Sequence, residues 1–109
     1  MAWVIKRFDI VWVNLDPTIG KEIKKTRPCL VISPDELNDN LDTVIVAPIT
    51  STIKKWPFRL SVKVGNNISS IAFDQMRSVS KMRIGRPVEK LSGGNKKKVL
   101  QILEAMFSG

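Results

Sequence analysis

Histidine is missing from this 109-residue chain, and its absence narrows the possible chemistry more than any other count. Histidine is the usual general base near neutral pH and the commonest metal ligand in proteins. The sequence therefore excludes zinc chemistry and the Ser-His-Asp mechanism. Any catalysis must use Arg, Lys, Asp, Glu, Ser and Thr, and we expect no cofactor.

Cysteine is almost as scarce, because Cys29 is the only one and an internal disulfide is therefore impossible. A single cysteine within an apolar segment is typical of a core residue in a protein of the reducing cytoplasm. The residues after Met1, AWVIKRF, lack the basic and long apolar regions of a secretion signal, and no run is long enough to span a membrane. The sequence therefore predicts a cytoplasmic protein without membrane contact.

Charge of one sign is in excess: 18 Lys and Arg residues stand against 10 Asp and Glu residues, which gives a net charge of +8. This excess is typical of proteins that bind nucleic acid or another polyanion, although a solvated surface that only keeps the protein soluble also fits residues 81–98. The acidic stretch 35–42 has no neighbouring base. A second domain does not fit, so we predict a single domain over residues 1–109.

Short β-rich runs divided by turn residues make up most of the chain and predict a mainly β fold. Pro48 favours an edge strand or a bulge, and residues 35–40 fit one helical turn or a tight loop. In the fourth run, hydrophobic and polar residues alternate strictly, which predicts that Arg59 lies on the exposed face. The expected strands cover 9–15, 29–33, 43–50, 58–64 and, as two short strands or one bent strand, 68–80.

The end of the chain is the one segment with helical spacing of its hydrophobic residues. Ser92 or Asn95 is placed to cap such a helix. Together with the strands before it, this helix predicts a small antiparallel barrel with one C-terminal α-helix packed against it. The apolar positions of the helix are Val99, Ile102, Leu103 and Met106.

Arg27 ends a polar loop, residues 18–26, and directly precedes a proline and an apolar run. Pro28 disfavours the helical conformation for Arg27, so its guanidinium is held by an extended backbone at the start of a rigid strand. Two further sets of polar residues lie at strand ends, and we expect the side chains of all three sets to converge. The sets are Glu22 with Arg27, Thr50 with Ser51, and Asp74 with Gln75 and Arg77.

Four segments between Asp9 and Lys81 resemble the MazF/PemK (Kid)-type endoribonuclease toxins of bacterial type II toxin–antitoxin systems, in order and in spacing. The resemblance implies an SH3-like barrel, a homodimer with composite sites, and metal-independent cleavage of single-stranded RNA at a short sequence. It also implies neutralisation by a cognate antitoxin. The segments are DIVWVNLDPTIGKE, TRPCLVIS, VIVAPITS and DQMRSV.

In this family the arginine before the proline and the threonine that ends APIT are tied to catalysis, and they correspond here to Arg27 and Thr50. An acidic residue of the first loop, matched by Glu22, also matters. The mechanism of one branch does not carry over, because its histidine and one of its arginines are replaced. The replacements are Lys21 and Ala72, and Phe8 stands where glycine is usual.

The chemistry of these residues agrees with the resemblance. In internal RNA cleavage the 2′-hydroxyl attacks its own phosphorus, so the enzyme must align the attack and stabilise a dianionic phosphorane. Arg27 offers a planar fork of donors, and Thr50 a hydroxyl that its β-branch holds in place. Glu22 is the candidate base. Ordinary structural roles are the alternative for all three: a charge-balancing loop residue, a surface arginine and a strand threonine.

RNA selectivity is expected to come from bases stacked on aromatic side chains and from contacts to base edges. Trp56 is the expected platform, with a hydrophobic cap or an antitoxin contact as its alternative role, whereas Trp12 is predicted to be core. For Asp74 and Gln75, a dimer contact or a structural hydrogen bond is the alternative. The residues expected to contact RNA are Lys21, Lys25, Ser51, Lys54, Trp56, Asp74, Gln75 and Arg77.

Two other functions fit the same barrel. A noncatalytic RNA-binding module would bind RNA without cutting it. A gyrase-poisoning toxin would inhibit a protein and have no hydrolytic site, and the TRP and APIT segments argue against it. Assays of RNA cleavage and of DNA supercoiling distinguish the three possibilities.

Overall fold

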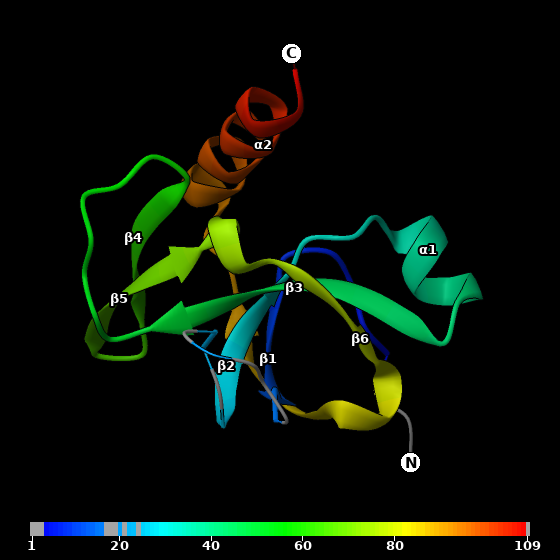
Figure 1. The fold of residues 1–109 in the computed structure, drawn as a ribbon. Helices are drawn as coiled ribbons and strands as arrows, with labels where there is room; N and C mark the ends of the chain where they lie inside the picture. Colours follow the sequence, from blue (N-terminus) through cyan, green and yellow to red (C-terminus); the bar gives the residue numbers. More distant parts are fainter. Residues whose placement is uncertain (1–3, 17–19, 21, 24, 109) are drawn as a thin grey trace.

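The structure is a computed structural model that describes residues 4–16, 20, 22–23 and 25–108. An antiparallel β-sheet curls into a half-barrel, and a C-terminal helix packs against it (Figure 1). The predicted mainly β fold, a small antiparallel barrel with one C-terminal α-helix, is confirmed. The elements are β1 (Asp9–Asn14), β2 (Thr26–Val31), α1 (Asp35–Asn40), β3 (Thr43–Thr50), β4 (Arg59–Val64), β5 (Asn67–Ala72), η1 (Phe73–Gln75), β6 (Arg77–Ser80), η2 (Lys81–Arg83), β7 (Ile84–Lys90) and α2 (Gly93–Phe107).

β3 lies at the centre of the sheet, whose strand order is β4-β5-β3-β2-β1-β7. Along one edge it changes partner, because residues 43–46 pair with β6 whereas Ile49 and Thr50 pair with β5. Pro48 is buried in this central strand opposite Cys29 of β2, so the prediction of an edge strand for it is wrong, and it lies where the ladder on the other side of β3 is interrupted. A proline, which cannot donate to a ladder, is tolerated where β6 gives way to β5.

β2 begins earlier than its apolar run suggests. The strand starts at Thr26, so Arg27 lies within it, opposite Val13 of β1. Pairing with β1 therefore extends β2 over residues that have no strand pattern of their own. β7 is a strand that the sequence does not predict, because its residues, IGRPVEK, contain glycine and proline and do not alternate.

α2 rises from one end of the sheet and packs on it through the predicted apolar face (Figure 1). Val99 is fully buried, and Ile102, Leu103 and Met106 contact the core cluster beneath the helix. Ser92 occupies the N-cap position, but its side chain makes no capping hydrogen bond in the described structure. No helix in the described part of the chain combines the length and the hydrophobicity that a membrane crossing requires.

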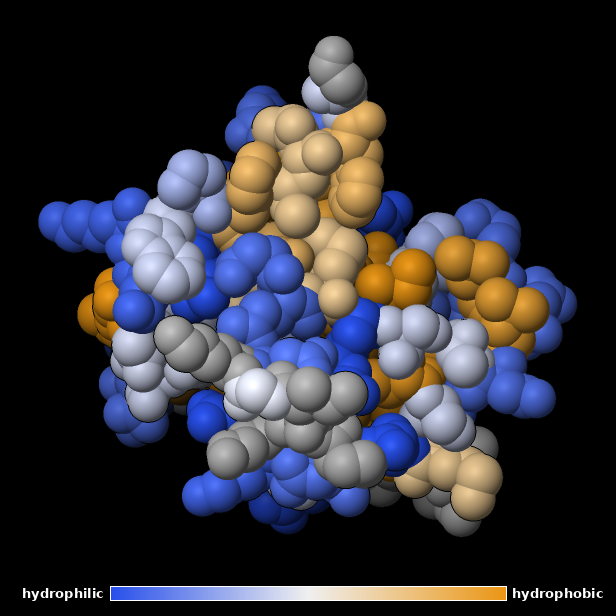
Figure 2. All heavy atoms as spheres, viewed as in Figure 1, coloured by the Kyte–Doolittle hydropathy of each residue, from blue (hydrophilic) through white to orange (hydrophobic). Residues whose placement is uncertain are grey.

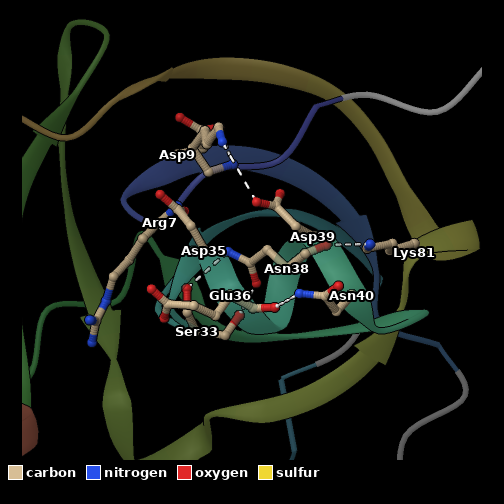
Figure 3. Close-up of polar contacts among 10 residues, drawn as sticks. Arg7, Asp9, Ser33, Asp35, Glu36, Asn38, Asp39, Asn40 and Lys81 are labelled. Carbon is tan, nitrogen blue, oxygen red and sulfur yellow. Dashed lines mark hydrogen bonds and ion pairs between the residues drawn. The ribbon is translucent and has the colours of Figure 1, made fainter.

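The acidic stretch 35–42, which includes α1, has basic neighbours that the sequence does not reveal. Lys6 Nζ lies 4.0 Å from the carboxylate of Asp39, and Lys81 Nζ donates to the backbone carbonyl of Asn38 (Figure 3). The expectation of an uncompensated acidic stretch is therefore wrong. Both lysines come from distant parts of the chain, so local sequence cannot show these contacts.

Phe8 has a left-handed backbone conformation, with a φ of 74°. Glycine reaches this region without a steric penalty, which explains why glycine suits the position. The ring is partly buried against the core, and Arg7 Cζ and Lys96 Nζ lie 5.5 and 5.6 Å from its centroid. The Phe8 N–H donates to the Val31 carbonyl at 2.8 Å, and the Leu91 N–H donates to the Phe8 carbonyl at 3.0 Å. Phe8 thus joins the end of β2 to the segment that leads into α2.

Replacing Phe8 by glycine and by alanine separates backbone strain from packing. Both variants lose the ring, but only alanine keeps a Cβ in the left-handed region, at a cost of about 1–2 kcal/mol. This cost exceeds the extra unfolded-state entropy of glycine, about 0.4–1 kcal/mol. We expect Phe8→Gly to have the larger free energy of unfolding in urea titrations. An alanine variant of equal or greater stability would contradict this explanation.

Cys29 is fully buried, which confirms its predicted core position. Burial raises the pKa of its thiol to about 12, although Arg27 and Arg77 act in the opposite direction. Because the thiolate is the reactive form, we expect the native protein at pH 8 to react with a thiol reagent at least ~100-fold more slowly than urea-unfolded protein. Similar rates in the two states would contradict this burial.

Candidate functional site

A groove of about 470 Å³ brings together one residue from each of the three sets of polar residues. Its walls are formed by the loop before β2, β2 itself, the end of β3, the β3–β4 connection, β4 and η1. We call it the Arg27 groove. It is lined by Ile23, Arg27, Thr50, Thr52, Lys54, Trp56, Arg59 and Gln75.

Among the described residues, Arg27 is the one that this groove shares with a second hollow. The second hollow, of about 360 Å³, is lined on its other sides by residues that include Trp12, Ser51 and Val88. The backbone of Arg27 is held by pairing with β1 and by the restriction that Pro28 imposes. Arg27 therefore stands between two hollows, and an elongated ligand can pass it with contacts on both sides.

Trp12 is not a core residue, and the prediction that it would be buried is wrong. Its neighbours Val11 and Val13 face one core cluster, whereas Trp12 is half-buried and lines the second hollow. The β-rich sequence around Trp12 predicts the strand correctly. It does not reveal that this face of β1 is left partly uncovered beside Arg27.

Thr50 ends β3 and is 8% exposed. Its Oγ1 accepts a hydrogen bond from the backbone N–H of Thr52 at 3.2 Å, which holds the hydroxyl together with the restricted χ1 of a β-branched residue. A hydroxyl that accepts in this way keeps its own proton for donation. Thr50 can therefore donate one hydrogen bond to an anion in the Arg27 groove.

Glu22 lines an adjoining hollow of about 400 Å³, together with Asp74, Gln75 and Arg77. Gln75 borders both this hollow and the Arg27 groove, and its Oε1 accepts a hydrogen bond at 2.7 Å from the backbone N–H of the residue after Glu22. Arg77 donates from Nη1 to the Leu15 carbonyl at 3.1 Å. Gln75 and Arg77 thus make structural hydrogen bonds, and Glu22 lies one hollow away from Arg27.

Arg59 is the charged groove residue that the sequence does not predict, because strict alternation assigns it to the exposed face of β4; Ile23 and Thr52 also line the groove without having been predicted. Its side chain is only 5% exposed. Its Nε and Nη2 donate to the two carboxylate oxygens of Asp74 at 2.5 and 3.0 Å. The bond lowers the pKa of Asp74 and raises that of Arg59. The ion pair therefore stabilises the fold at pH values above the pKa of an ordinary Asp. This stabilisation is lost only as the pH falls through the lowered pKa of Asp74.

The remaining predicted RNA contacts are spread around the groove. Ser51 lines the second hollow, and Lys54 and Trp56 line the Arg27 groove. Lys25 is exposed, and its backbone N–H donates to the Asp16 carboxylate at 3.0 Å, so it shapes the loop before β2. Lys21 lies outside the described residues.

The Arg27 groove is a cationic, hydrogen-bonding site. Its described lining contains three cations, Arg27, Lys54 and Arg59, and no carboxylate. Planar guanidinium groups bind phosphate oxygens through two parallel hydrogen bonds, and the Thr50 hydroxyl adds a donor. Within the described residues, Cys, Asp and Glu side chains form no cluster of three that would hold a metal ion. The groove is therefore suited to binding and polarising a phosphate group.

Comparisons with known proteins all find relatives in one family of toxins. A family described as "PemK-like, MazF-like toxin of type II toxin-antitoxin system" matches residues 6–107. The "Endoribonuclease toxin MazF" of Escherichia coli (strain K12) is 34% identical over 73 residues, which cover 66% of this chain and 65% of that protein, slightly less than two thirds. The "Endoribonuclease EndoA" of Bacillus subtilis (strain 168) is 31% identical over 107 residues, covering 93% and 92%. The crystal structure of MazF from Deinococcus radiodurans has a TM-score of 0.82 and 26% identity, covering 95% of this chain and 96% of that one.

Proposed function

The chain belongs to the PemK-like, MazF-like family of toxins of type II toxin–antitoxin systems, and we propose that it is an endoribonuclease that cuts single-stranded RNA at a short sequence motif. Two relatives that carry the name endoribonuclease support this activity. The observation that carries the proposal is that Arg27 and Thr50 line one cationic groove. Cleavage of mRNA by such an enzyme inhibits translation and growth.

The proposed reaction is attack of a 2′-hydroxyl on the adjacent phosphorus, which breaks the bond between phosphorus and the 5′ oxygen. It leaves a 2′,3′-cyclic phosphate and, once the departing oxygen takes a proton from water, a 5′-hydroxyl. The Arg27 guanidinium binds two phosphate oxygens and stabilises the dianionic phosphorane, because it is a cation whose planar fork of donors matches two phosphate oxygens. Thr50 donates a further hydrogen bond to the phosphate. This charge stabilisation comes from side chains, so the proposed reaction is independent of metal ions.

The attacking 2′-hydroxyl must lose a proton, and Glu22 is the proposed acceptor. Its position one hollow away from Arg27 requires that the RNA, or a water molecule, bridge the space beside Gln75. Arg27 is a poor acceptor, because a guanidinium group has five N–H donors and no acceptor atom. The role of Glu22 therefore rests on its nearness to the groove and on the family resemblance.

The RNA is proposed to run past Arg27 from one hollow to the other. On one side Ser51 and Trp12 are available to a nucleotide, and on the other side Lys54 and Trp56 are available. The net charge of +8 favours association with the RNA backbone at low salt. This arrangement places the scissile phosphate at Arg27, with bases on either side of it.

A cognate antitoxin and a second copy of the chain are the proposed protein partners, in the cytoplasm. The family description supports the antitoxin. Apolar side chains gather along α2 on the face shown in Figure 2, and an apolar hollow lies between β4 and α2, lined by residues that include Phe58, Leu60 and Ile102. Exposed apolar surface of this kind is typical of protein contacts.

The test is incubation of the purified protein with a long single-stranded RNA in EDTA, in parallel with a DNA gyrase supercoiling assay. Discrete cuts at one short motif and unaffected supercoiling are expected. RNA that is bound but uncut would favour the noncatalytic binding module. Intact RNA with inhibited supercoiling would favour the gyrase-poisoning toxin.

A further inference from the structure

Trp56 presents an aromatic ring at the edge of the Arg27 groove and is 51% exposed. Two cations lie over this ring: Lys54 Nζ is 4.5 Å and Arg59 Cζ is 4.9 Å from its centroid. An aromatic platform combined with cations is the arrangement with which proteins bind the unpaired bases of single-stranded nucleic acid. The ring is thus a candidate base-binding surface beside Arg27.

The two cations over Trp56 are held very differently. Arg59 has a side chain that is 5% exposed and forms a two-point ion pair with Asp74. Lys54 belongs to the exposed connection between β3 and β4, where a cation–π contact is weak. A base can therefore displace the Lys54 ammonium from the ring, whereas Arg59 stays in place.

The backbone that joins Trp56 to Arg59 is strained and firmly held. The Arg59 N–H donates to the Trp56 carbonyl at 3.3 Å and closes a turn with Pro57 in its second position. Phe58, in the third position, has a φ of 66°, where a turn of this kind normally has glycine. Phe58 is partly buried against the core, and the Phe73 N–H donates to its carbonyl at 3.1 Å. Strained residues persist where their surroundings fix them, and they cluster at ligand sites.

We propose that Trp56, Arg59 and Asp74 form a subsite for one unpaired RNA base next to the scissile phosphate. Trp56 stacks on the base, and Arg59 and Asp74 are positioning residues: Asp74 fixes the guanidinium, and the guanidinium fixes the ring. This inference rests on the proposed function for its ligand. It changes the predicted role of Asp74 as an RNA contact, because the Asp74 carboxylate binds Arg59 and not the RNA.

The subsite acts on binding and base choice and leaves the chemical step unchanged. Loss of one stacked base is expected to raise the KM for RNA about 10-fold or more in Trp56→Ala, with kcat changed less than about 2-fold. Arg59→Ala and Asp74→Asn are expected to raise KM by a smaller factor and to relax the cleavage motif at one position. Arg59→Lys keeps the charge without the two-point pair, so it is expected to resemble Arg59→Ala.

The experiment uses short RNAs with 2-aminopurine at successive positions around the cut and one 2′-deoxy nucleotide at the cut, so that binding is read without cleavage. Stacking on an indole quenches this base, and we expect quenching at one position only. Quenching should disappear in Trp56→Ala and weaken in Arg59→Ala and Asp74→Asn. Lys63→Ala is the matched control, because it removes a cation from the exposed face of the same strand.

The outcomes separate the subsite from the proposed function. The subsite would be overturned if the variants at Trp56, Arg59 and Asp74 matched Lys63→Ala in quenching and in KM. This holds even if the wild-type protein cuts RNA. Trp56 would then be assigned to a protein contact. A wild-type protein that cuts no RNA would contradict the proposed function, and the quenching series would still decide whether a base stacks on Trp56.

Discussion

Arg27→Ala is expected to lower the single-turnover rate of RNA cleavage by about 10³-fold or more, with little change in thermal stability. The guanidinium is the cation shared by both hollows, and an arginine that stabilises a phosphoryl transition state contributes about 10³–10⁵-fold in enzymes that use one. The side chain is half-buried at the start of β2, so its loss opens the groove without emptying the core. Cleavage of end-labelled RNA and circular dichroism melting measure the two effects.

Arg27→Lys is the matched control for this prediction. Lysine keeps the positive charge but not the planar fork, so partial activity is expected, between that of the alanine variant and that of the wild type. If Arg27→Ala cut RNA within about tenfold of the wild-type rate, Arg27 would not stabilise the transition state and the proposed site would be wrong.

Thr50→Val is expected to lower kcat by about 10²-fold, which is the lower end of the effect of removing one transition-state hydrogen-bond donor. Valine keeps the β-branched shape and removes only the hydroxyl. The same change takes away the acceptor of the Thr52 N–H, so a stability loss of about 1 kcal/mol is also expected. Rates measured under saturating RNA, together with urea unfolding, separate the two effects.

Thr50→Ser provides the comparison, because serine restores the hydroxyl without the β-branch. Its kcat is expected to lie within about tenfold of the wild-type value, since a freer χ1 weakens the positioning but keeps the donor. A valine variant that keeps the wild-type kcat while the serine variant loses activity would show that Thr50 acts through packing, and its hydroxyl would have no part in the reaction.

Local sequence predicts most of the fold because most strands have a β pattern of their own. The run that ends at Thr50 and the apolar face that includes Val99 are found directly from periodicity. β7 is missed because it contains a glycine and a proline and has no β pattern of its own. It forms a strand because it pairs with β1, and the register of that pairing shifts along the strand. Pro48 is misplaced for a related reason: its tolerance depends on where β3 exchanges one partner strand for another.

The candidate site is predicted less completely than the fold. Arg27 and Thr50 stand at recognisable strand positions, and the structure brings both into one groove. Arg59 cannot be found from its strand, because alternation marks it as exposed, whereas its guanidinium pairs with the distant Asp74 and lies against the Trp56 ring. Contacts of this kind depend on how the sheet curls, which no local pattern records.

The central claim, that the Arg27 groove promotes attack by a 2′-hydroxyl on its own phosphorus, is tested most directly with two RNAs that differ by one atom. One is all RNA, and the other has a single 2′-deoxy nucleotide on the 5′ side of the mapped cut. In EDTA, the wild-type protein is expected to cut the first RNA to a 2′,3′-cyclic phosphate and a 5′-hydroxyl, and to leave the second intact at that position. Cleavage of the 2′-deoxy substrate at the same site, or fragments that carry a 5′-phosphate, would contradict the account.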